Sequence, residues 1–263
     1  MARGKGHAWS RPDEFKVVLV PDREALARVG ARMVVEWLGA SDPATVIPAM
    51  GNTPQQLYLE LARLHREDAF HTGNLVAIQL DEYADVSETD PRSLFGWLDR
   101  SFARPLGIPR PRIIGLNGGS VDWQSACRAY DRSVAAVLGV RVAILGLGHN
   151  GHLGFNEPPS GPDAPTRLVR LAPESIISNA KYWPGYDQLP TQALTSGMPW
   201  LLGATHRLLV VSGREKRAIL RRVLTEPVDP VLPASHLRSV PGSVLLADHA
   251  AWPPDMSAPE VTA

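Results

Sequence analysis

Residues 142–158, "VAILGLGHNGHLGFNEP", join a short apolar run to a turn that is rich in glycine and in polar side chains. The run 142–147 contains no polar residue, which is typical of a strand buried on both faces of a parallel sheet. The ten residues after it include two histidines, two asparagines and a glutamate. Because ligands bind beyond the carboxyl ends of such strands, we expect this turn to carry chemistry.

Similar apolar runs recur along the chain and alternate with segments of helical periodicity, among them 22–39, 53–64 and 214–224. Alternation of buried strands with helices predicts an α/β fold in which helices cover both faces of a mostly parallel sheet. The remaining predicted strands are 15–20, 45–50, 75–80, 207–212 and 243–247.

The segment 158–193 is rich in proline, glycine and serine and interrupts this alternation. We therefore expect it to form an insertion or lid. No linker or internal repeat divides the chain, so we expect one domain over residues 1–263, with loose tails at 1–14 and 252–263.

Composition excludes several functional classes. Lysine plus arginine equals aspartate plus glutamate at 27 each, so no net charge favours nucleic acid or an anionic membrane. The single cysteine, Cys127, rules out an internal disulfide framework and a cysteine-based zinc site. No run approaches the ~18 apolar residues of a membrane span, and the N-terminus lacks a secretory apolar region. We expect a cytoplasmic protein without nucleic-acid or membrane partners.

Two candidate anion sites follow predicted strands. In "GNTPQQ" (51–56), Gly51 permits close backbone approach, and Thr53 and Gln56 can form a capping box. A free helix N-terminus can bind phosphate, but this motif taken alone favours an ordinary well-capped helix. In "SGREKR" (212–217), a second capping box of Ser212 and Glu215 precedes Lys216. A lysine in a first helical turn opposes the helix dipole, which indicates either a bound anion or a solvated side chain.

Three further side chains could move protons. Asp81 follows the predicted strand 75–80, where a carboxylate can act as a base or simply cap a helix. His152 and Glu157 can meet across the glycine-rich turn, with the carboxylate orienting the imidazole. A zinc site that adds His149 fits poorly, since no helix holds the ligands. The glycine spacing at 146–151 is not followed by a helix, so a dinucleotide fingerprint is discounted.

Taken together, four motifs resemble the glucosamine-6-phosphate deaminase/isomerase family, a relative of the 6-phosphogluconolactonases. The resemblance extends from about residue 45 to 250, and "FNEP" distinguishes the deaminases from the lactonases. The motifs, in order, are "GNTP" (51–54), "LDEYADV" (80–86), "GLGHNGHLGFNEP" (146–158) and "QALTSG" (192–197).

The resemblance implies a Rossmann-like fold and a 2-amino-2-deoxy-hexose 6-phosphate substrate, converted to a ketose 6-phosphate and ammonia without metal or cofactor. By position, Asp81 matches the base that moves a proton between C2 and C1, and His152 matches the group that opens the sugar ring. Glu157 matches its orienting carboxylate. The matching phosphate-binding residues are Gly51, Asn52, Thr53, Lys216 and, more weakly, Lys181 in place of an arginine.

Two positions depart from the family pattern. Asn150 stands where the motif usually has an acid. An amide favours the protonated form of His152 less than a carboxylate does, and it can neither accept a proton nor pair with the ammonium group of the substrate. Arg167, followed by Val169, replaces the basic pair that binds an N-acetylated effector, so allosteric activation is not expected. Self-association stays an expectation from the family.

Three hypotheses follow from these residues. The first is isomerisation with deamination of glucosamine 6-phosphate or its galactosamine epimer. The second is a lactonase-like hydrolase, in which His152 activates water and Asp81 is dispensable. The third is a non-deaminating phosphosugar isomerase or a binding protein. The persistence of Asp81, His152 and Glu157 favours the first.

Overall fold

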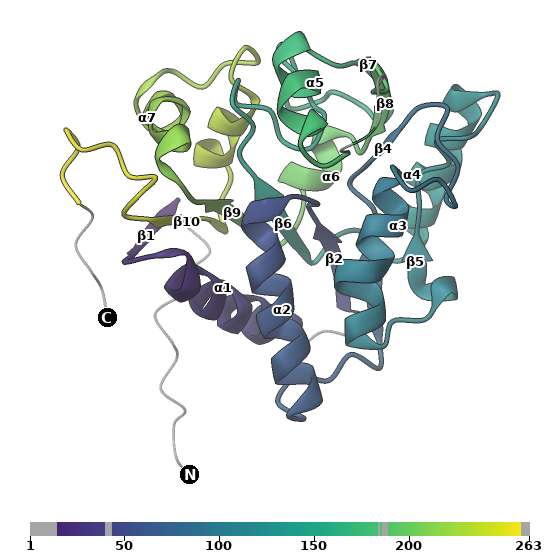
Figure 1. Ribbon diagram of the computed structural model, residues 1–263, viewed down its shortest axis with the longest axis horizontal. Helices are drawn as coiled ribbons and strands as arrows, with labels where there is room; N and C mark the ends of the chain where they lie inside the picture. The colour runs from purple at the N-terminus through teal and green to yellow at the C-terminus, as the bar shows by residue number, and fades with distance from the viewer. Residues whose placement is uncertain (1–14, 40–43, 184, 186–188, 259–263) are drawn as a thin grey trace.

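The computed structural model describes residues 15–39, 44–183, 185 and 189–258 (Figure 1). The predicted loose tail at 1–14 lies outside the described residues, as do residues 259–263 at the other end. The chain alternates strands and helices along most of its length, as the apolar runs predict.

Seven strands form one sheet in the order β1-β10-β9-β6-β2-β3-β5, and every neighbouring pair is parallel. The predicted α/β class with a mostly parallel sheet is therefore confirmed. The strands are β1 Lys16–Val20, β2 Ala44–Pro48, β3 Leu75–Ile78, β5 Ile113–Ile114, β6 Val142–Gly146, β9 His206–Val211 and β10 Ser243–Asp248.

Alternate residues of the central strands enter two separate cores. In β6, Val142 and Ile144 pack into the core on one face, while Ala143 and Leu145 pack into the core on the other. All four side chains are fully buried. Because both faces are covered, the strand needs apolar residues at every position, and this produces the continuous run seen in the sequence.

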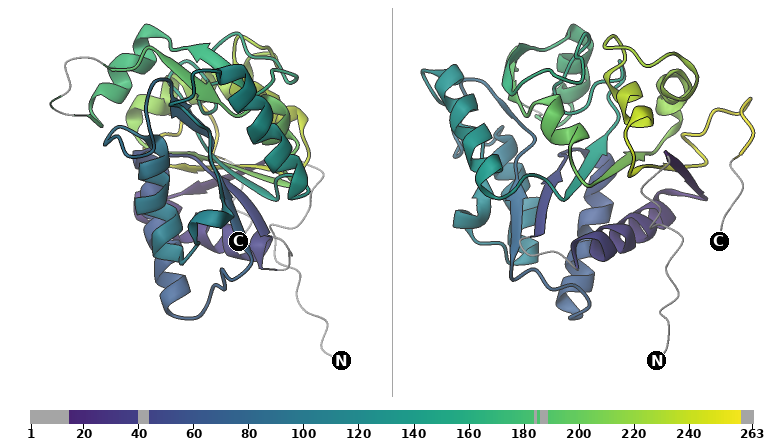
Figure 2. Two further views of the ribbon diagram at one scale, coloured as in Figure 1. Left: turned by 90° about the vertical axis from the view of Figure 1, so that its right-hand side faces the viewer. Right: turned by 180° about the vertical axis from the view of Figure 1, so that it is seen from behind.

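Helices cover both faces of this sheet (Figure 2). Helices α1 and α2 pack against each other in the first core, which contains Val142 and Ile144, together with the segment 94–106. Helices α4, α6 and α7 border the second core, which contains Ala143 and Leu145. The helices are α1 Arg23–Leu38, α2 Asn52–Arg66, α3 Leu94–Leu98, α4 Trp123–Ala136, α5 Pro173–Ala180, α6 Met198–Leu202 and α7 Arg217–Thr225. Short 3₁₀ or π-helical turns are η1 Asp99–Ala103, η2 Arg104–Leu106, η3 Arg110–Arg112, η4 Arg214–Lys216 and η5 Pro233–Ser239.

A second sheet of three antiparallel strands includes part of the predicted lid. It has the order β4-β8-β7, with β4 Asp81–Tyr83, β7 Arg167–Arg170 and β8 Gln192–Thr195. The segment 158–193 therefore holds ordered elements, β7 and α5, which lie at the same end of the molecule as α7 (Figure 1). Its residues 184 and 186–188 lie outside the described part.

The order of the strands fixes where a ligand can bind. From β2 the chain proceeds outward through β3 to β5, whereas from β6 it proceeds outward in the opposite direction through β9 to β10. The adjacent strands β2 and β6 thus flank the point at which the direction of winding reverses. Ligands of open α/β sheets bind in the crevice at this point, beyond the carboxyl ends of the strands.

Both predicted capping boxes are wrong. Helix α2 begins at Asn52, one residue before the predicted cap, and its N-cap Gly51 makes no side-chain hydrogen bond. The hydroxyl of Ser212 donates instead to Asp248 at 2.6 Å, and η4 starts after Gly213 without a side-chain cap. Both helix starts therefore keep free backbone N–H groups.

The start of the predicted C-terminal tail is packed rather than loose. The Trp252 side chain is only 9% exposed and belongs to the second core, and its indole N–H donates to the carbonyl of Met256 at 3.2 Å. Large aromatic side chains bury enough surface to fix a chain end. Within the described residues, no helix has the length and apolar character needed to cross a membrane.

Candidate active site

A cavity of about 310 Å³ opens beyond the carboxyl ends of four main-sheet strands. Residues that follow β2, β3, β6 and β9 line it, together with residues from α5 and its C-terminal end. Seven of the nine predicted site residues lie on its wall: Gly51, Asn52, Thr53, Asp81, His152, Lys181 and Lys216. The other two, Asn150 and Glu157, contact His152 instead.

The turn after β2 presents backbone to the cavity. Gly51 has φ +150°, a conformation that side chains disfavour, so glycine is needed at this position. The start of α2 follows at once, with uncapped N–H groups and the positive end of the helix dipole. The guanidinium of Arg23 donates to the carbonyl of Asn52 at 3.1 Å and also lines the cavity. This corner is built to attract an anion.

Two lysines reach the same cavity from different elements. Lys216, in η4, donates its ammonium to the carbonyl of Leu147 at 2.7 Å. Burial lowers the pKa of Lys216, and the neighbouring Lys181 lowers it further, while Glu215 opposes the change. Lys181 follows α5, is exposed, and lies 5.0 Å from the centre of the Tyr182 ring. An entering anion would relieve the repulsion between these cations.

His152 is held against the backbone of the turn that precedes it. A Cβ atom on Gly148 would lie 2.1 Å from the His152 ring, so only glycine fits there. The backbone N–H of Gly148 donates to the carbonyl of His152 at 3.1 Å and closes the turn. The absence of a side chain at Gly148 therefore makes room for the imidazole on the cavity wall.

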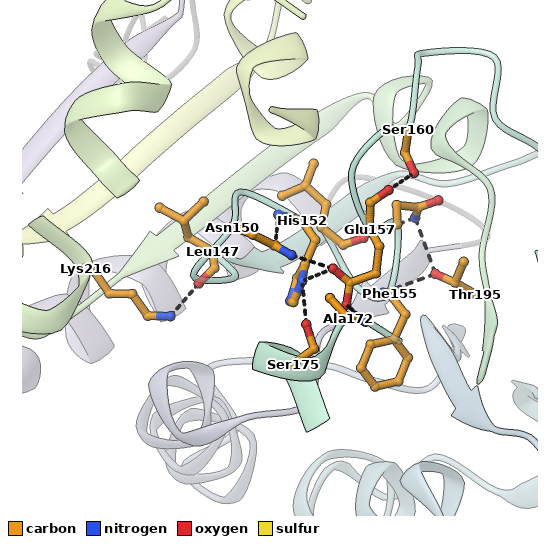
Figure 3. Close-up of polar contacts among 12 residues, drawn as sticks. Leu147, Asn150, His152, Phe155, Glu157, Ser160, Ala172, Ser175, Thr195 and Lys216 are labelled. Atoms are coloured by element: carbon orange, nitrogen blue, oxygen red, sulfur yellow. Dashed lines mark hydrogen bonds and ion pairs between the residues drawn. The ribbon is translucent and has the colours of Figure 1, made fainter. Parts of the chain in front are cut away.

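Glu157 lies beside His152 and contacts its ring (Figure 3). Its Oε2 atom lies 3.2 Å from Nδ1 of His152 and accepts a 2.6 Å hydrogen bond from the Asn150 amide. Burial by itself would raise the pKa of Glu157, but the hydrogen bond and charge of His152, with smaller contributions from Ser175 and Asn150, lower it to about 2. The carboxylate is thus ionised and fixes the orientation of the imidazole.

Asn150 therefore acts on the same pair. Its side-chain oxygen accepts from the backbone N–H of His152 at 3.2 Å, while its amide donates to Glu157. An acid in place of this amide could not donate to Glu157 and would add a second negative charge. Asn150 is not on the cavity wall, so its position favours an indirect role.

Asp81 is buried on the cavity wall, with 8% of its surface exposed. Burial raises its pKa to about 8, and the charge of Glu82 contributes to the same direction. A carboxyl group with a pKa near neutrality can accept and return a proton in the physiological range. Asp81 opens the short strand β4 rather than a helix, so the alternative reading as a helix cap is wrong.

Glu82 anchors this strand beneath the cavity. Its carboxylate accepts hydrogen bonds from the backbone N–H groups of Leu94 and Phe95 at 2.9 Å each, and from the Ser93 hydroxyl at 2.8 Å. The Gln79 amide adds a further bond at 3.1 Å. Burial raises the pKa of Glu82, and these donors oppose that shift.

Arg167, at the position that corresponds to the family's effector-binding pair, makes structural contacts. Arg167, in β7, donates to the side-chain oxygen of Asn156 at 2.9 Å and to the hydroxyl of Ser160 at 2.8 Å. The Ser160 hydroxyl in turn donates to the carbonyl of Glu157. Arg167 thus binds residues on both sides of Glu157 and stabilises the turn.

Several cavity residues were missed by sequence reasoning, because no local pattern marks them. Arg23 belongs to the ordinary first turn of α1, and His149 entered only the discounted zinc site. Tyr83 and Trp97 form an aromatic wall with Trp183, whose indole N–H donates to the Tyr83 hydroxyl at 3.4 Å. Among the described residues, no group of three histidine, cysteine or acidic side chains is placed to hold a metal ion.

Residues 21–246 match the family described as glucosamine-6-phosphate isomerases/6-phosphogluconolactonase. The chain is 33% identical to glucosamine-6-phosphate deaminase of Bacillus velezensis, over 90% of this chain and 98% of that protein. It is 35% identical to the Streptomyces coelicolor deaminase, over 90% and 91%.

The solved structures that resemble this chain include a deaminase and, with lower similarity, 6-phosphogluconolactonases. A monomeric glucosamine-6-phosphate deaminase aligns with a TM-score of 0.87 and 31% identity, over 90% of this chain and 98% of that one. The 6-phosphogluconolactonase of Leishmania guyanensis aligns with a TM-score of 0.73 and 19% identity, over 92% and 99%. At that identity the lactonase likeness concerns the fold alone.

Proposed function

This chain belongs to the family of glucosamine-6-phosphate isomerases and 6-phosphogluconolactonases and is deaminase-like within it, and we propose that it converts glucosamine 6-phosphate and water to fructose 6-phosphate and ammonia. The observation that carries this proposal is the meeting of Asp81, His152 and two lysines at one cavity. The curated relatives named as deaminases support the choice of substrate.

The phosphate of the substrate would bind where the cations and free N–H groups converge. The Gly51–Thr53 turn offers backbone donors, and Lys216 and Lys181 offer charge. Lys181 supplies a point charge rather than the bidentate fork of an arginine. Binding at this corner would direct the sugar ring towards the space between Asp81 and His152.

Ring opening falls to His152. Because Glu157 engages Nδ1, the Nε2 atom is the nitrogen left for the substrate. Nε2 would donate a proton to the ring oxygen as the ring opens. Glu157 would hold the imidazole of His152 in one orientation both before and after it gives up this proton. Asn150 would act through Glu157, to which it donates, rather than on the amine itself.

Proton transfer between C2 and C1 falls to Asp81. Its burial keeps the carboxyl group near the pKa at which it can take a proton from one carbon and return it to the other. Loss of the amine as ammonia and addition of water then yield the ketose. The single-domain arrangement of residues 1–263 is part of this proposal, because the cavity combines residues at the ends of four strands of one sheet, β2, β3, β6 and β9.

A lactonase-like hydrolase is the alternative to be tested. It would use His152 to activate water and would have no need of Asp81. A non-deaminating isomerase or a binding protein is the third possibility. The galactosamine epimer differs only at C4, and the names of the relatives favour the glucosamine form.

The decisive experiment measures ammonia and fructose 6-phosphate together. Glucosamine 6-phosphate should give both in equal amounts, and galactosamine 6-phosphate should react more slowly. Ketose without ammonia would indicate a pure isomerase, and hydrolysis of 6-phosphogluconolactone without either product would indicate the lactonase. Failure of every phosphosugar to react would leave the binding protein.

A further inference from the structure

His149 is an imidazole on the cavity wall to which the reaction described above gives no role. It directly follows Gly148 in the catalytic turn and is exposed. Its ring centre lies 6.2 Å from that of His152, with the two planes at 66°. Lys216 reaches the carbonyl of Leu147, two residues before His149. The imidazole therefore lines the same cavity as His152 and Lys216 and lies close to His152.

We propose that His149 is a phosphate-binding residue of this enzyme, and that it takes up a proton as the dianionic phosphate of the substrate enters. This inference rests on the proposed function, since it concerns the same cavity and a phosphorylated ligand. The imidazolium would donate a charge-assisted hydrogen bond to a phosphate oxygen beside Lys216. The only bond formed is that between His149 and the added proton, which comes from solvent.

Burial and the nearby positive charges disfavour the protonated form of His149 while the cavity holds no ligand. Burial lowers the pKa of His149, and Lys216, His152 and Lys181 lower it further, whereas Glu157 acts in the opposite direction. The other charged groups on the cavity wall are Arg23, Asp81 and Glu215. Near neutral pH, a further cation in this corner is therefore unfavourable.

A phosphate monoester reverses this balance. It carries a charge of about −1.5 to −2 near pH 7, with a second pKa of about 6. Its negative charge would offset the lysines and favour the protonated imidazole. The affinity for phosphosugar should consequently be linked to one proton on the protein, over the range above about pH 6 in which the ligand is a dianion.

The test is calorimetric titration with glucitol 6-phosphate, an open-chain phosphosugar that lacks the carbonyl and amine needed for turnover. Titrations at pH 7 in two buffers of different ionisation enthalpy give the number of protons taken up on binding. The proteins compared are the wild type, His149→Gln, His149→Lys and His71→Gln. His71 is the matched control, because its side chain is 81% exposed and does not line the cavity.

We expect His149→Gln to bind about tenfold more weakly and to lose most of one proton of uptake relative to the wild type, as for the loss of a hydrogen bond to a charged group. His149→Lys should retain the affinity but lose the same uptake, since lysine already carries its charge at pH 7. His71→Gln should match the wild type in both quantities.

Equal proton uptake by the wild type and His149→Gln would overturn this inference, whatever their affinities, and would leave the proposed function standing. Absence of binding to the wild type would overturn the inference, and the proposed function would be overturned with it only where the ammonia assay also shows no turnover. The ammonia assay on the same preparations separates the cases, because it reports turnover independently of the proton count.

Discussion

The Nδ1 atom of His152 lies 3.2 Å from the Oε2 atom of Glu157, and the same oxygen accepts the Asn150 amide. In the proposed function, this contact makes Glu157 the group that determines which imidazole nitrogen faces the substrate. We predict that Glu157→Gln, which keeps the shape and removes the charge, lowers kcat about 100-fold, within the range for disturbed acid–base catalysis. Steady-state kinetics on glucosamine 6-phosphate measure this, with the exposed Glu174→Gln as the control. A wild-type rate in Glu157→Gln would remove its orienting role.

The same carboxylate links folding to pH. The pKa of Glu157 in the folded protein is about 2, below the ordinary value of about 4.3. A depressed pKa stabilises the fold above the unfolded pKa, and this contribution is lost as the pH falls through the folded one. The stability difference between wild type and Glu157→Gln should therefore be constant above about pH 5 and shrink towards pH 2. Urea unfolding across this range measures it, and a difference that does not change with pH would contradict it.

Asp81→Asn should abolish turnover while stabilising the protein. A positioned base contributes about 10²–10⁴ in rate, so we expect kcat to fall at least about 1,000-fold. The pKa of Asp81 is raised to about 8, so the folded state holds a proton that the unfolded state has lost, and wild-type stability falls as the pH rises from about 4 to about 8.

An asparagine at position 81 does not ionise, so it causes no loss of stability as the pH rises. Asp81→Asn should consequently melt at least about 2–4 °C above the wild type at pH 8, the shift for about 1 kcal/mol in a chain of this size, and near it at pH 4. Thermal unfolding at both pH values measures this, and the exposed Asp85→Asn serves as control. Full turnover by Asp81→Asn would instead support the lactonase alternative.

The two lysines should differ in their contribution to binding. Lys216 is partly buried and held by the carbonyl of Leu147, whereas Lys181 is exposed and more strongly screened by solvent. We predict that Lys216→Gln raises KM for glucosamine 6-phosphate about 10- to 100-fold, and that Lys181→Gln raises it less. Activity on unphosphorylated glucosamine, measured at high concentration, should not distinguish the variants. An equal loss on both substrates would place the lysines away from the phosphate.

The fold was predictable because its central strands are buried on both faces. A strand such as β6 must be apolar at every position, and that produces a run visible in any sequence. The site followed from the same rule, since ligands bind where those runs end. The grouping of Asp81, His152 and Lys216 at one cavity agrees with the expected arrangement, while their roles stay predictions.

The parts that sequence could not give depend on partners far along the chain. The hydroxyl of Ser212 contacts Asp248 instead of capping a helix, and no local pattern announces that choice. Asp81 starts a strand because β4 pairs with β8, whose residues lie more than a hundred positions away. Arg23 reaches the cavity only because α1 packs beside α2. Local sequence patterns predict none of these three arrangements.

Asn150→Asp tests the departure at the catalytic turn. The present amide donates to Glu157 at 2.6 Å, so an aspartate there would place two carboxylates within hydrogen-bond distance. Like charges this close raise the pKa of one carboxyl, and the added negative charge favours the His152 imidazolium. We predict a changed kcat and a pH profile displaced to higher pH on its acidic limb. The profile of kcat/KM from pH 5 to 9 measures this, and an unchanged profile would show that the position does not matter.

Arg167 should not respond to an N-acetylated amino-sugar phosphate. Its guanidinium is engaged by Asn156 and Ser160, and binding an effector anion would remove it from the turn that carries Glu157. We therefore predict hyperbolic kinetics that do not change when such a compound is added. Arg167→Gln should lower kcat and destabilise the protein by about 1–3 kcal/mol, since buried hydrogen-bond partners lose their donor. Initial rates at several substrate concentrations, with and without the compound, test the first expectation, and urea unfolding tests the second. Activation that disappears in Arg167→Gln would assign Arg167 to an effector site and contradict the structural role.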